Sequence, residues 1–141
     1  MGASRSPLVS VVIPVYNGQE VIAEAIRSVL AQTYDNFHLT IANNCSTDRT
    51  AQIAEEFAAQ DERVTVYNAT EFVSVVGSHN RAFTLIADDA KYCKILGADD
   101  WLFPNCLAEL VRVAEAYPTI GMVTSYVQTD SGGVLFERCS A

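Results

Sequence analysis

The sequence predicts a doubly wound α/β fold, in which a mostly parallel sheet carries helices on both faces. The first observation is the segment 8–15, a nearly continuous run of apolar and β-branched residues. Such runs are typical of parallel strands that are covered on both faces. The second observation is that strand-like and helix-like patterns alternate four times along the chain, which is the order that βαβ units produce. The 141 residues fit a single domain that covers 1–141.

Four further segments are predicted to be strands. Apolar residues alternate with others in 37–42 and 63–67, so each of these segments has one apolar face. The segment 92–96 is short and mixed, whereas 120–127 is long and rich in β-branched residues. We therefore expect five strands.

Between these strands, apolar residues recur at helical spacing. A first helix is predicted on a stripe from Val21 to Leu30, and a second follows the start signal Ser46-Thr47-Asp48. Ala82, Leu85 and Ile86 mark a third helix. A fourth helix carries Leu107, Leu110, Val111 and Ala114, begins near Pro104 and ends before Pro118.

Composition narrows the classes of ligand. Nine basic residues against seventeen acidic ones give a net charge of −8, which argues against a nucleic-acid-binding groove. A ligand that carries phosphates would therefore need a bound cation to offset its charge. The four cysteines form no C-x-x-C pair, and residues 1–7 lack an apolar stretch. We accordingly expect reduced thiols, no signal peptide and a cytoplasmic protein.

Three polar clusters follow predicted strands at the edge where a parallel sheet binds its ligands. They are Tyr16-Asn17-Gly18 after the first strand, Asn43-Asn44-Cys45-Ser46 after the second and Asp99-Asp100 after the fourth. In open parallel sheets, ligands bind outside the carboxyl ends of the strands. The fold is therefore expected to bring these clusters together.

The pair Asp99-Asp100 has the chemistry of a divalent-cation site. Carboxylate oxygens suit a hard cation such as Mn²⁺ or Mg²⁺, although an aspartate at this place can also simply cap the following turn. The tripeptide Ala87-Asp88-Asp89 repeats Ala98-Asp99-Asp100. Because Asp88 and Asp89 precede the fourth strand, they are expected at the opposite edge of the sheet as a solvated turn.

The polar residues after the first two strands have two interpretations each. Pro14 ends a strand because it lacks a ladder donor, Tyr16 offers a flat face for a base, and Asn17 can hold a turn through its own side chain. Asn44 offers both a donor and acceptors with which a base edge could be read. Plain turn chemistry would explain the same residues equally well.

Taken together, four blocks resemble family-2 glycosyltransferases of the GT-A fold. The first block is Val9-Ser10-Val11-Val12-Ile13-Pro14-Val15-Tyr16-Asn17-Gly18, and the second is Ala25-Ile26-Arg27-Ser28-Val29-Leu30-Ala31-Gln32-Thr33-Tyr34. The third is Asn43-Asn44-Cys45-Ser46-Thr47-Asp48-Arg49-Thr50, and the fourth is Ala98-Asp99-Asp100-Trp101-Leu102. The resemblance runs from residue 7 to residue 117 in the order and spacing of the family.

The resemblance implies a function and roles for single residues. Pro14, Tyr16 and Asn17 would line the nucleotide pocket, with Tyr16 stacking on the base. Asn44 stands where the family often places a base-reading carboxylate. Asp99 would face the ribose or diphosphate, and Asp100 would bind the Mn²⁺ or Mg²⁺ ion. The implied reaction is the inverting transfer of a sugar from a nucleoside-diphosphate sugar to a hydroxyl of a saccharide or lipid-linked acceptor.

Two positions depart from the family's pattern. Asn43-Asn44 replaces the common Asp-Asp after the second strand, which leaves the preferred base open. Gly97 stands where many relatives carry the first aspartate of the D-x-D region. A non-catalytic nucleotide-sugar-binding module would share every one of these motifs, so it remains the alternative.

The acceptor side of such an enzyme is expected to be missing from this chain. The family's catalytic base lies downstream, and Asp130 is the weak candidate within the chain. The fold would then be truncated on its acceptor side and would end on an open sheet edge, through which two copies could form a homodimer. In the full-length protein, we expect a location at the inner face of the membrane.

Overall fold

Four parallel strands form the sheet on which the molecule is built. The computed structural model describes residues 6–125, 127–129 and 134–135. The strands are β1 (Val9–Val15), β2 (Phe37–Asn43), β3 (Val64–Asn68) and β4 (Tyr92–Ile95), in the spatial order β3-β2-β1-β4. β1 lies between β2 and β4 and has a core cluster on each face, and every one of its residues is buried. Its position in the sheet explains the nearly continuous apolar run in the sequence.

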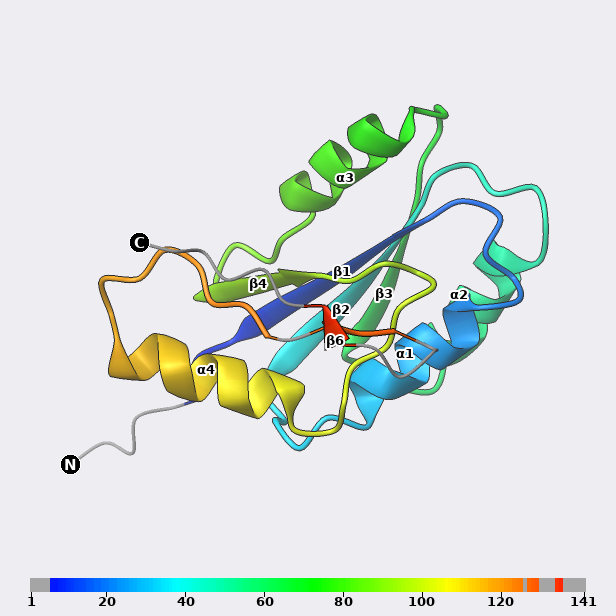
Figure 1. Cartoon of the computed structure of the whole chain (residues 1–141). Helices are drawn as coiled ribbons and strands as arrows, with labels where there is room; N and C mark the ends of the chain where they lie inside the picture. The colour runs from blue at the N-terminus through cyan, green and yellow to red at the C-terminus, as the bar shows by residue number, and fades with distance from the viewer. Residues whose placement is uncertain (1–5, 126, 130–133, 136–141) are drawn as a thin grey trace.

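The helices cover both faces of this sheet, as the sequence predicts (Figure 1). They are α1 (Ile22–Leu30), α2 (Thr50–Ala58), α3 (Val75–Thr84) and α4 (Cys106–Ala116). Buried residues of α1, α2 and α4 belong to one core cluster, whereas Ala82 of α3 belongs to a second cluster on the other face. The doubly wound α/β prediction is therefore confirmed.

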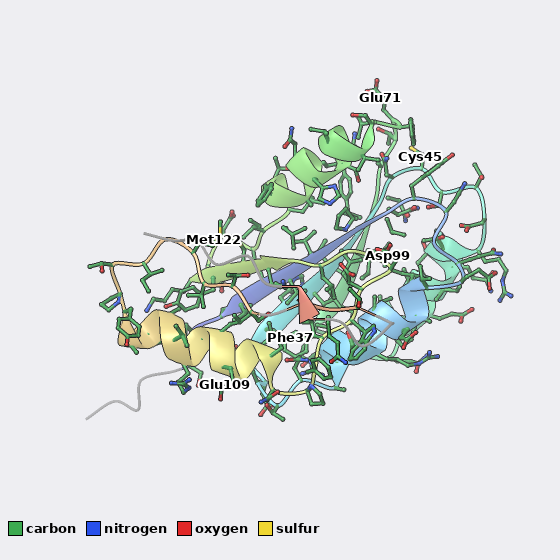
Figure 2. All side chains as sticks on the ribbon, viewed as in Figure 1. Phe37, Cys45, Glu71, Asp99, Glu109 and Met122 are labelled. Atoms are coloured by element: carbon green, nitrogen blue, oxygen red, sulfur yellow. The ribbon has the colours of Figure 1, made fainter. Side chains whose placement is uncertain are left out.

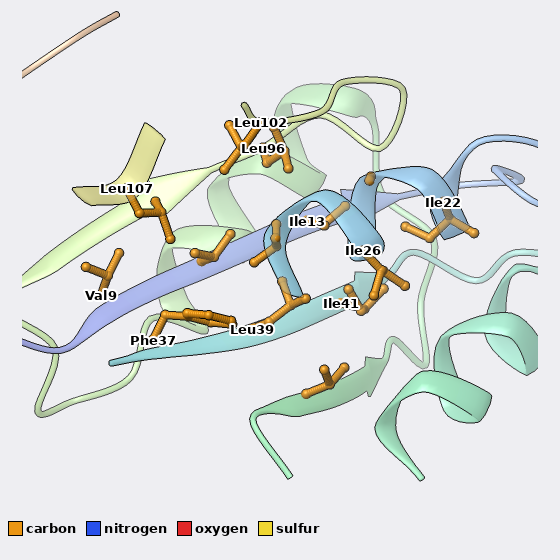
Figure 3. Packing of buried hydrophobic residues seen from close by; sticks show 14 of the residues in the cluster. Val9, Ile13, Ile22, Ile26, Phe37, Leu39, Ile41, Leu96, Leu102 and Leu107 are labelled. Atoms are coloured by element: carbon orange, nitrogen blue, oxygen red, sulfur yellow. The ribbon is translucent and has the colours of Figure 1, made fainter. Parts of the chain in front are cut away.

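Alternation along β1 decides which core each residue joins. Ile13 points toward α1 in the larger core, beside Leu39 and Ile41 of β2 (Figure 3). Val11 belongs to the same core cluster. Val12, which lies between them in the sequence, packs against the α3 side instead. Successive side chains of a strand point to opposite faces, so a single apolar strand contributes to both cores.

The structure corrects the prediction of a strand over 120–127. Residues 120–125 form no strand, and only Val127–Gln128 (β5) is extended and paired. It pairs antiparallel with Val134–Leu135 (β6) in a separate ladder, apart from the main sheet. Strand propensity produces a strand only where a neighbouring strand supplies backbone partners, and within the described ranges no strand pairs with 120–125. The sheet edge predicted at this last strand is therefore not an edge of the main sheet, whose outer strands are β3 and β4.

A smaller correction concerns the third helix. It covers Val75–Thr84 and thus begins earlier than the apolar residues Ala82, Leu85 and Ile86 indicate. Leu85 and Ile86 follow its end, although both still pack beside Val12. The helix starts where the Ser74 side chain accepts a hydrogen bond from the Gly77 amide at 3.2 Å, an N-cap that replaces a missing intrahelical bond.

Candidate donor site

The three polar clusters meet at the carboxyl edge of the sheet. Val15 at the end of β1 pairs with Asn43 at the end of β2, and Val12 pairs with Ile95 at the end of β4. The segments that follow these strands therefore leave the sheet side by side. In Figure 2, Asp99 lies in the loop after β4 at this edge, and Cys45 and Glu71 lie in the loops that follow β2 and β3. The predicted convergence is confirmed.

The loops after β1 and β2 are fastened to each other by their own polar groups. The Asn17 side-chain oxygen accepts from the backbone N–H of Thr47 at 2.8 Å, and the backbone N–H of Asn17 donates to the Ser46 hydroxyl at 2.9 Å. The sequence suggests that Asn17 holds a turn through its own side chain. In the structure it joins two loops instead. Its backbone adopts a left-handed conformation with φ 49°, which asparagine tolerates better than most residues.

Two residues of the second loop complete this fastening. The Gly18 amide donates to the buried hydroxyl of Thr50 at 2.8 Å, and this hydroxyl donates to Asp48 at 2.5 Å. The Asp48 carboxylate also accepts from the backbone N–H of Gln19 at 3.1 Å. We refer to the bonds made by Asn17, Gly18, Ser46, Asp48 and Thr50 as the loop clasp. The sequence pattern Ser46-Thr47-Asp48 predicts only the start of a helix, so this second role was not predicted.

The clasp changes the acidity of Asp48. Partial desolvation raises the pKa of this carboxyl, but the hydrogen bonds from the Thr50 hydroxyl and from the Thr50 and Gln19 amides outweigh it. The net effect is a pKa below the usual value, because these donors stabilise the ionised form. Asp48 is therefore an ionised anchor of the clasp at neutral pH.

Two exposed aromatic rings stand next to each other above the ends of β1 and β3. Tyr16 is 50% exposed and Phe72 is 55% exposed, and their ring centroids lie 4.9 Å apart in an edge-on arrangement. Pro14, by contrast, is buried within β1. Phe72 carries no recognisable sequence motif, so only the structure reveals that it stands beside Tyr16.

Asn44 is buried, and both the nitrogen and the oxygen of its side-chain amide are hydrogen-bonded. Its nitrogen donates to the Val73 carbonyl at 2.8 Å, and its oxygen accepts from the Val73 amide at 3.1 Å. The same oxygen accepts from the Arg81 guanidinium at 3.1 Å. Asn44 thus holds the segment before α3 and one residue of α3 itself.

The carboxylates of Asp99 and Asp100 converge above Gly97. A Cβ atom placed on Gly97 would lie 2.7 Å from an Asp100 oxygen and 3.1 Å from an Asp99 oxygen. The Cβ position of residue 97 is therefore within 3.1 Å of an oxygen from each carboxylate. Both side chains are exposed, and carboxylate oxygens are the ligands that hard divalent cations prefer. Within the described ranges, no group of three or more acidic, histidine or cysteine side chains is placed to hold a metal, so a bound ion would take further ligands from its substrate or from water.

The segment that follows the two aspartates is hydrogen-bonded to α1 and to the residues just after it. The Leu102 amide donates to the Ser28 hydroxyl at 3.0 Å, and the buried Gln32 side chain donates to the Phe103 carbonyl at 2.8 Å. Gln32 also accepts from the Leu107 amide at 2.9 Å. These bonds fix the position at which the chain leaves Asp100, and they give the second block of the sequence a structural role.

The remaining acidic residues of interest lie elsewhere. Asp88 and Asp89 precede β4, where the Lys91 amide donates to the Leu8 carbonyl at the start of β1. The pair is therefore at the amino edge, as predicted. Glu109 lies on α4 (Figure 2) and is paired with Arg112 at 2.8 Å. Asp130 falls outside the described residues.

Across the described ranges, the helices are all too short or too polar to cross a bilayer.

Comparisons with known proteins assign the chain to a family. The sequence model of glycosyl transferase family 2 matches residues 10–141. Protein y4gI of Sinorhizobium fredii is 37% identical over 97% of this chain, but the match covers only 15% of that protein.

Two solved structures share the fold. The mannosyltransferase PcManGT of Pyrobaculum calidifontis, in complex with GDP-Man and Mn²⁺, superposes with a TM-score of 0.72 at 25% identity and covers 84% of this chain. TarS of S. aureus in complex with UDP superposes with a TM-score of 0.70 at 22% identity and covers 78% of this chain. The matches span 35% and 32% of those two chains, so this chain corresponds to about a third of each. The chain belongs to glycosyltransferase family 2.

Proposed function

We propose that this chain forms the donor site of a glycosyltransferase, which transfers a sugar with inversion from a nucleoside-diphosphate sugar to an acceptor hydroxyl. The convergence of the Asp99 and Asp100 carboxylates above Gly97, at the carboxyl edge of the sheet, carries this proposal. PcManGT with GDP-Man and Mn²⁺ and TarS with UDP are consistent with a nucleotide-sugar ligand.

Each residue of the edge has a proposed part in holding the donor. Tyr16 offers its exposed ring to the base, while Pro14 and Asn17 shape the floor and the loop beside it. Asn44 stands on the base side. Asp99 faces the ribose or diphosphate, and Asp100 binds a Mn²⁺ or Mg²⁺ ion.

Charge explains why this site would need a cation. In a chain of net charge −8, two exposed carboxylates would repel a diphosphate that approached them alone. When bound, the ion offsets the negative charge of the diphosphate as it leaves the sugar. The residues of the chain then have the task of orienting the donor so that the acceptor attacks from the face opposite the leaving group.

The test is a binding titration of the 141-residue chain with UDP and GDP, in the presence of Mn²⁺ and again in the presence of a chelator. We expect the affinity for at least one nucleotide to fall by about tenfold or more on chelation, which corresponds to at least about 1.4 kcal/mol. Equal affinities under the two conditions would contradict the metal-dependent donor site.

The alternative, a nucleotide-sugar-binding module without catalysis, predicts the same binding. It differs only in the longer protein, where an acceptor would remain unglycosylated. Turnover of a sugar nucleotide by the full-length protein, in the presence of saccharide acceptors, separates the two functions.

A further inference from the structure

The nucleotide pocket proposed above contains a cation that the sequence does not single out. Arg81 lies on α3, is half-buried, and uses one N–H group to reach the neutral amide of Asn44 at 3.1 Å. Among the described residues, no carboxylate is paired with it. By contrast, Arg63, Lys91 and Arg112 each lie within 2.8 Å of a carboxylate oxygen. Arg81 therefore retains an uncompensated positive charge and several unused donors at the carboxyl edge.

Asn44 positions the Arg81 guanidinium. The amide of Asn44 pairs with both the N–H and the C=O of Val73, as a neighbouring strand would. A carboxylate at position 44 could not do this, because an ionised carboxylate only accepts hydrogen bonds. It would also neutralise Arg81. The replacement of the family's common aspartate by Asn44 thus has a consequence for the charge of the pocket.

The hydrogen bonds between Asn44 and Val73 also position an aromatic ring. Phe72 directly precedes Val73, and its ring lies against Tyr16. Because the Val73 amide and Arg81 donate to the same oxygen of Asn44, the guanidinium lies close to the backbone that carries Phe72. A flat base stacked at Tyr16 and Phe72 would have its edge near Arg81.

We propose that Arg81 selects the base by donating to a carbonyl oxygen on its edge, and that Asn44 is the residue that positions Arg81 and Phe72 for this contact. A guanidinium donates and never accepts. It therefore favours a base with a carbonyl at the recognised position and disfavours one with an amino group there. Uracil and guanine carry that carbonyl, whereas cytosine and adenine carry the amino group. The inference rests on the proposed donor site.

The test compares two pairs of nucleotides in which the members have the same ring size. Affinities for UDP against CDP and for GDP against ADP are measured with Mn²⁺ on the wild type. One of the two pairs has a ring size that fits the site. In that pair, the nucleotide whose base carries the carbonyl, UDP or GDP, should bind at least about tenfold tighter than its partner, which is the discrimination expected of a good contact to one base edge. Arg81→Met should reduce this ratio to about one, mainly by weakening the carbonyl member, and Arg81→Lys should retain part of it because it keeps the charge.

Matched variants distinguish selection from a general loss of binding. Arg112→Met removes the same charge from the surface of α4 and should leave the ratio unchanged. Asn44→Asp should lower the ratio, because its carboxylate would engage Arg81 and release the Val73 carbonyl. A purely structural Asn44 would instead weaken both members equally.

Two results would overturn the inference. The first is an Arg81→Met variant that binds every nucleotide more weakly by the same factor, which would assign Arg81 to the diphosphate. The second is a wild-type ratio near one in both pairs. Failure of the underlying donor site would look different, since the wild type would then bind none of the nucleotides.

Discussion

Asp89 and Asp100 end two identical tripeptides, yet they lie at opposite ends of β4. Asp100 stands at the carboxyl edge with its oxygen near that of Asp99, whereas Asp89 precedes the strand. The chain therefore contains an internal control for the proposed metal site, because the tripeptide is the same and its position in the fold differs.

Asp100→Asn should weaken Mn²⁺-dependent binding of the preferred nucleotide by about tenfold or more, or at least about 1.4 kcal/mol. The amide keeps an oxygen but loses the charge that attracts the ion. Asp89→Asn, which alters the net charge equally, should bind like the wild type. If the two variants lose affinity to the same degree in calorimetric titrations, a general charge effect and not a metal site is responsible.

Gly97 tests the geometry of the same site. A methyl group at this position would occupy space 2.7 Å from an Asp100 oxygen, so Gly97→Ala should push the two carboxylates apart. Since the displaced atoms are ends of flexible side chains, the melting temperature should not change. The concentration of Mn²⁺ needed for half-maximal nucleotide binding should rise by about threefold to tenfold, a cost of about 0.7–1.4 kcal/mol. An unchanged Mn²⁺ requirement would mean that the carboxylates do not act together.

At the scale of the elements, the loop clasp connects β1 and α1 to β2 and α2. Asp48 has a lowered pKa in the folded protein, so its contribution to stability is present above the unfolded pKa of about 3.9. The contribution disappears as the pH falls through the lower folded value. Asp48→Asn should therefore melt below the wild type at pH 7, and the difference should narrow as the pH is lowered from about 4 toward 3.

Thermal melts at several pH values check this expectation. Asp88→Asn serves as the matched control, because Asp88 is exposed at the opposite edge and makes no part of the clasp. A gap between Asp48→Asn and the wild type that stays constant down to pH 3 would show that the ionised carboxylate does not stabilise the clasp.

The elements also show how far sequence reasoning reaches. Every residue of β1 is buried, and α1 buries one stripe of its surface, so their local patterns suffice to predict them. The segment 120–127 carries an equally strong pattern, but the hydrogen bonds that make a strand come from a neighbour that can lie anywhere in the chain. Its absence from the sheet could not be predicted from the segment alone.

The same division applies to the candidate site. Asp99, Asn44 and Tyr16 follow predicted strands, and the rule for parallel sheets is sufficient to bring them to one edge. Phe72 and Arg81 reach that edge through hydrogen bonds of Asn44 with a segment 29 positions downstream and with α3. Such contacts depend on the packing of α3 across the sheet, and no local pattern encodes it.

For the molecule as a whole, the division of labour between donor and acceptor sides is open to experiment. The residues proposed to hold the donor all lie between Pro14 and Asp100, within the part of the chain that the structure describes. Inverting transfer also requires a general base within hydrogen-bond reach of the acceptor hydroxyl. Glu109 is paired with Arg112, and Glu115 is paired with Lys91. The hydrogen bonds from Lys91 and Tyr92 lower the pKa of Glu115, and its partners stand at the start of β4, away from Asp99.

We therefore expect the 141-residue chain to bind a sugar nucleotide without transferring its sugar. The purified chain would be incubated with Mn²⁺, a panel of sugar nucleotides and simple saccharide acceptors, and products would be separated by mass. Donor binding should be measurable in the same samples, while acceptor-dependent glycoside should stay at the level of samples without protein. Glycoside above that level would contradict the expectation. It would direct attention to Asp130, and Asp130→Asn should then abolish transfer while leaving the affinity for the donor intact, because a base that acts on the acceptor contributes little to holding the nucleotide.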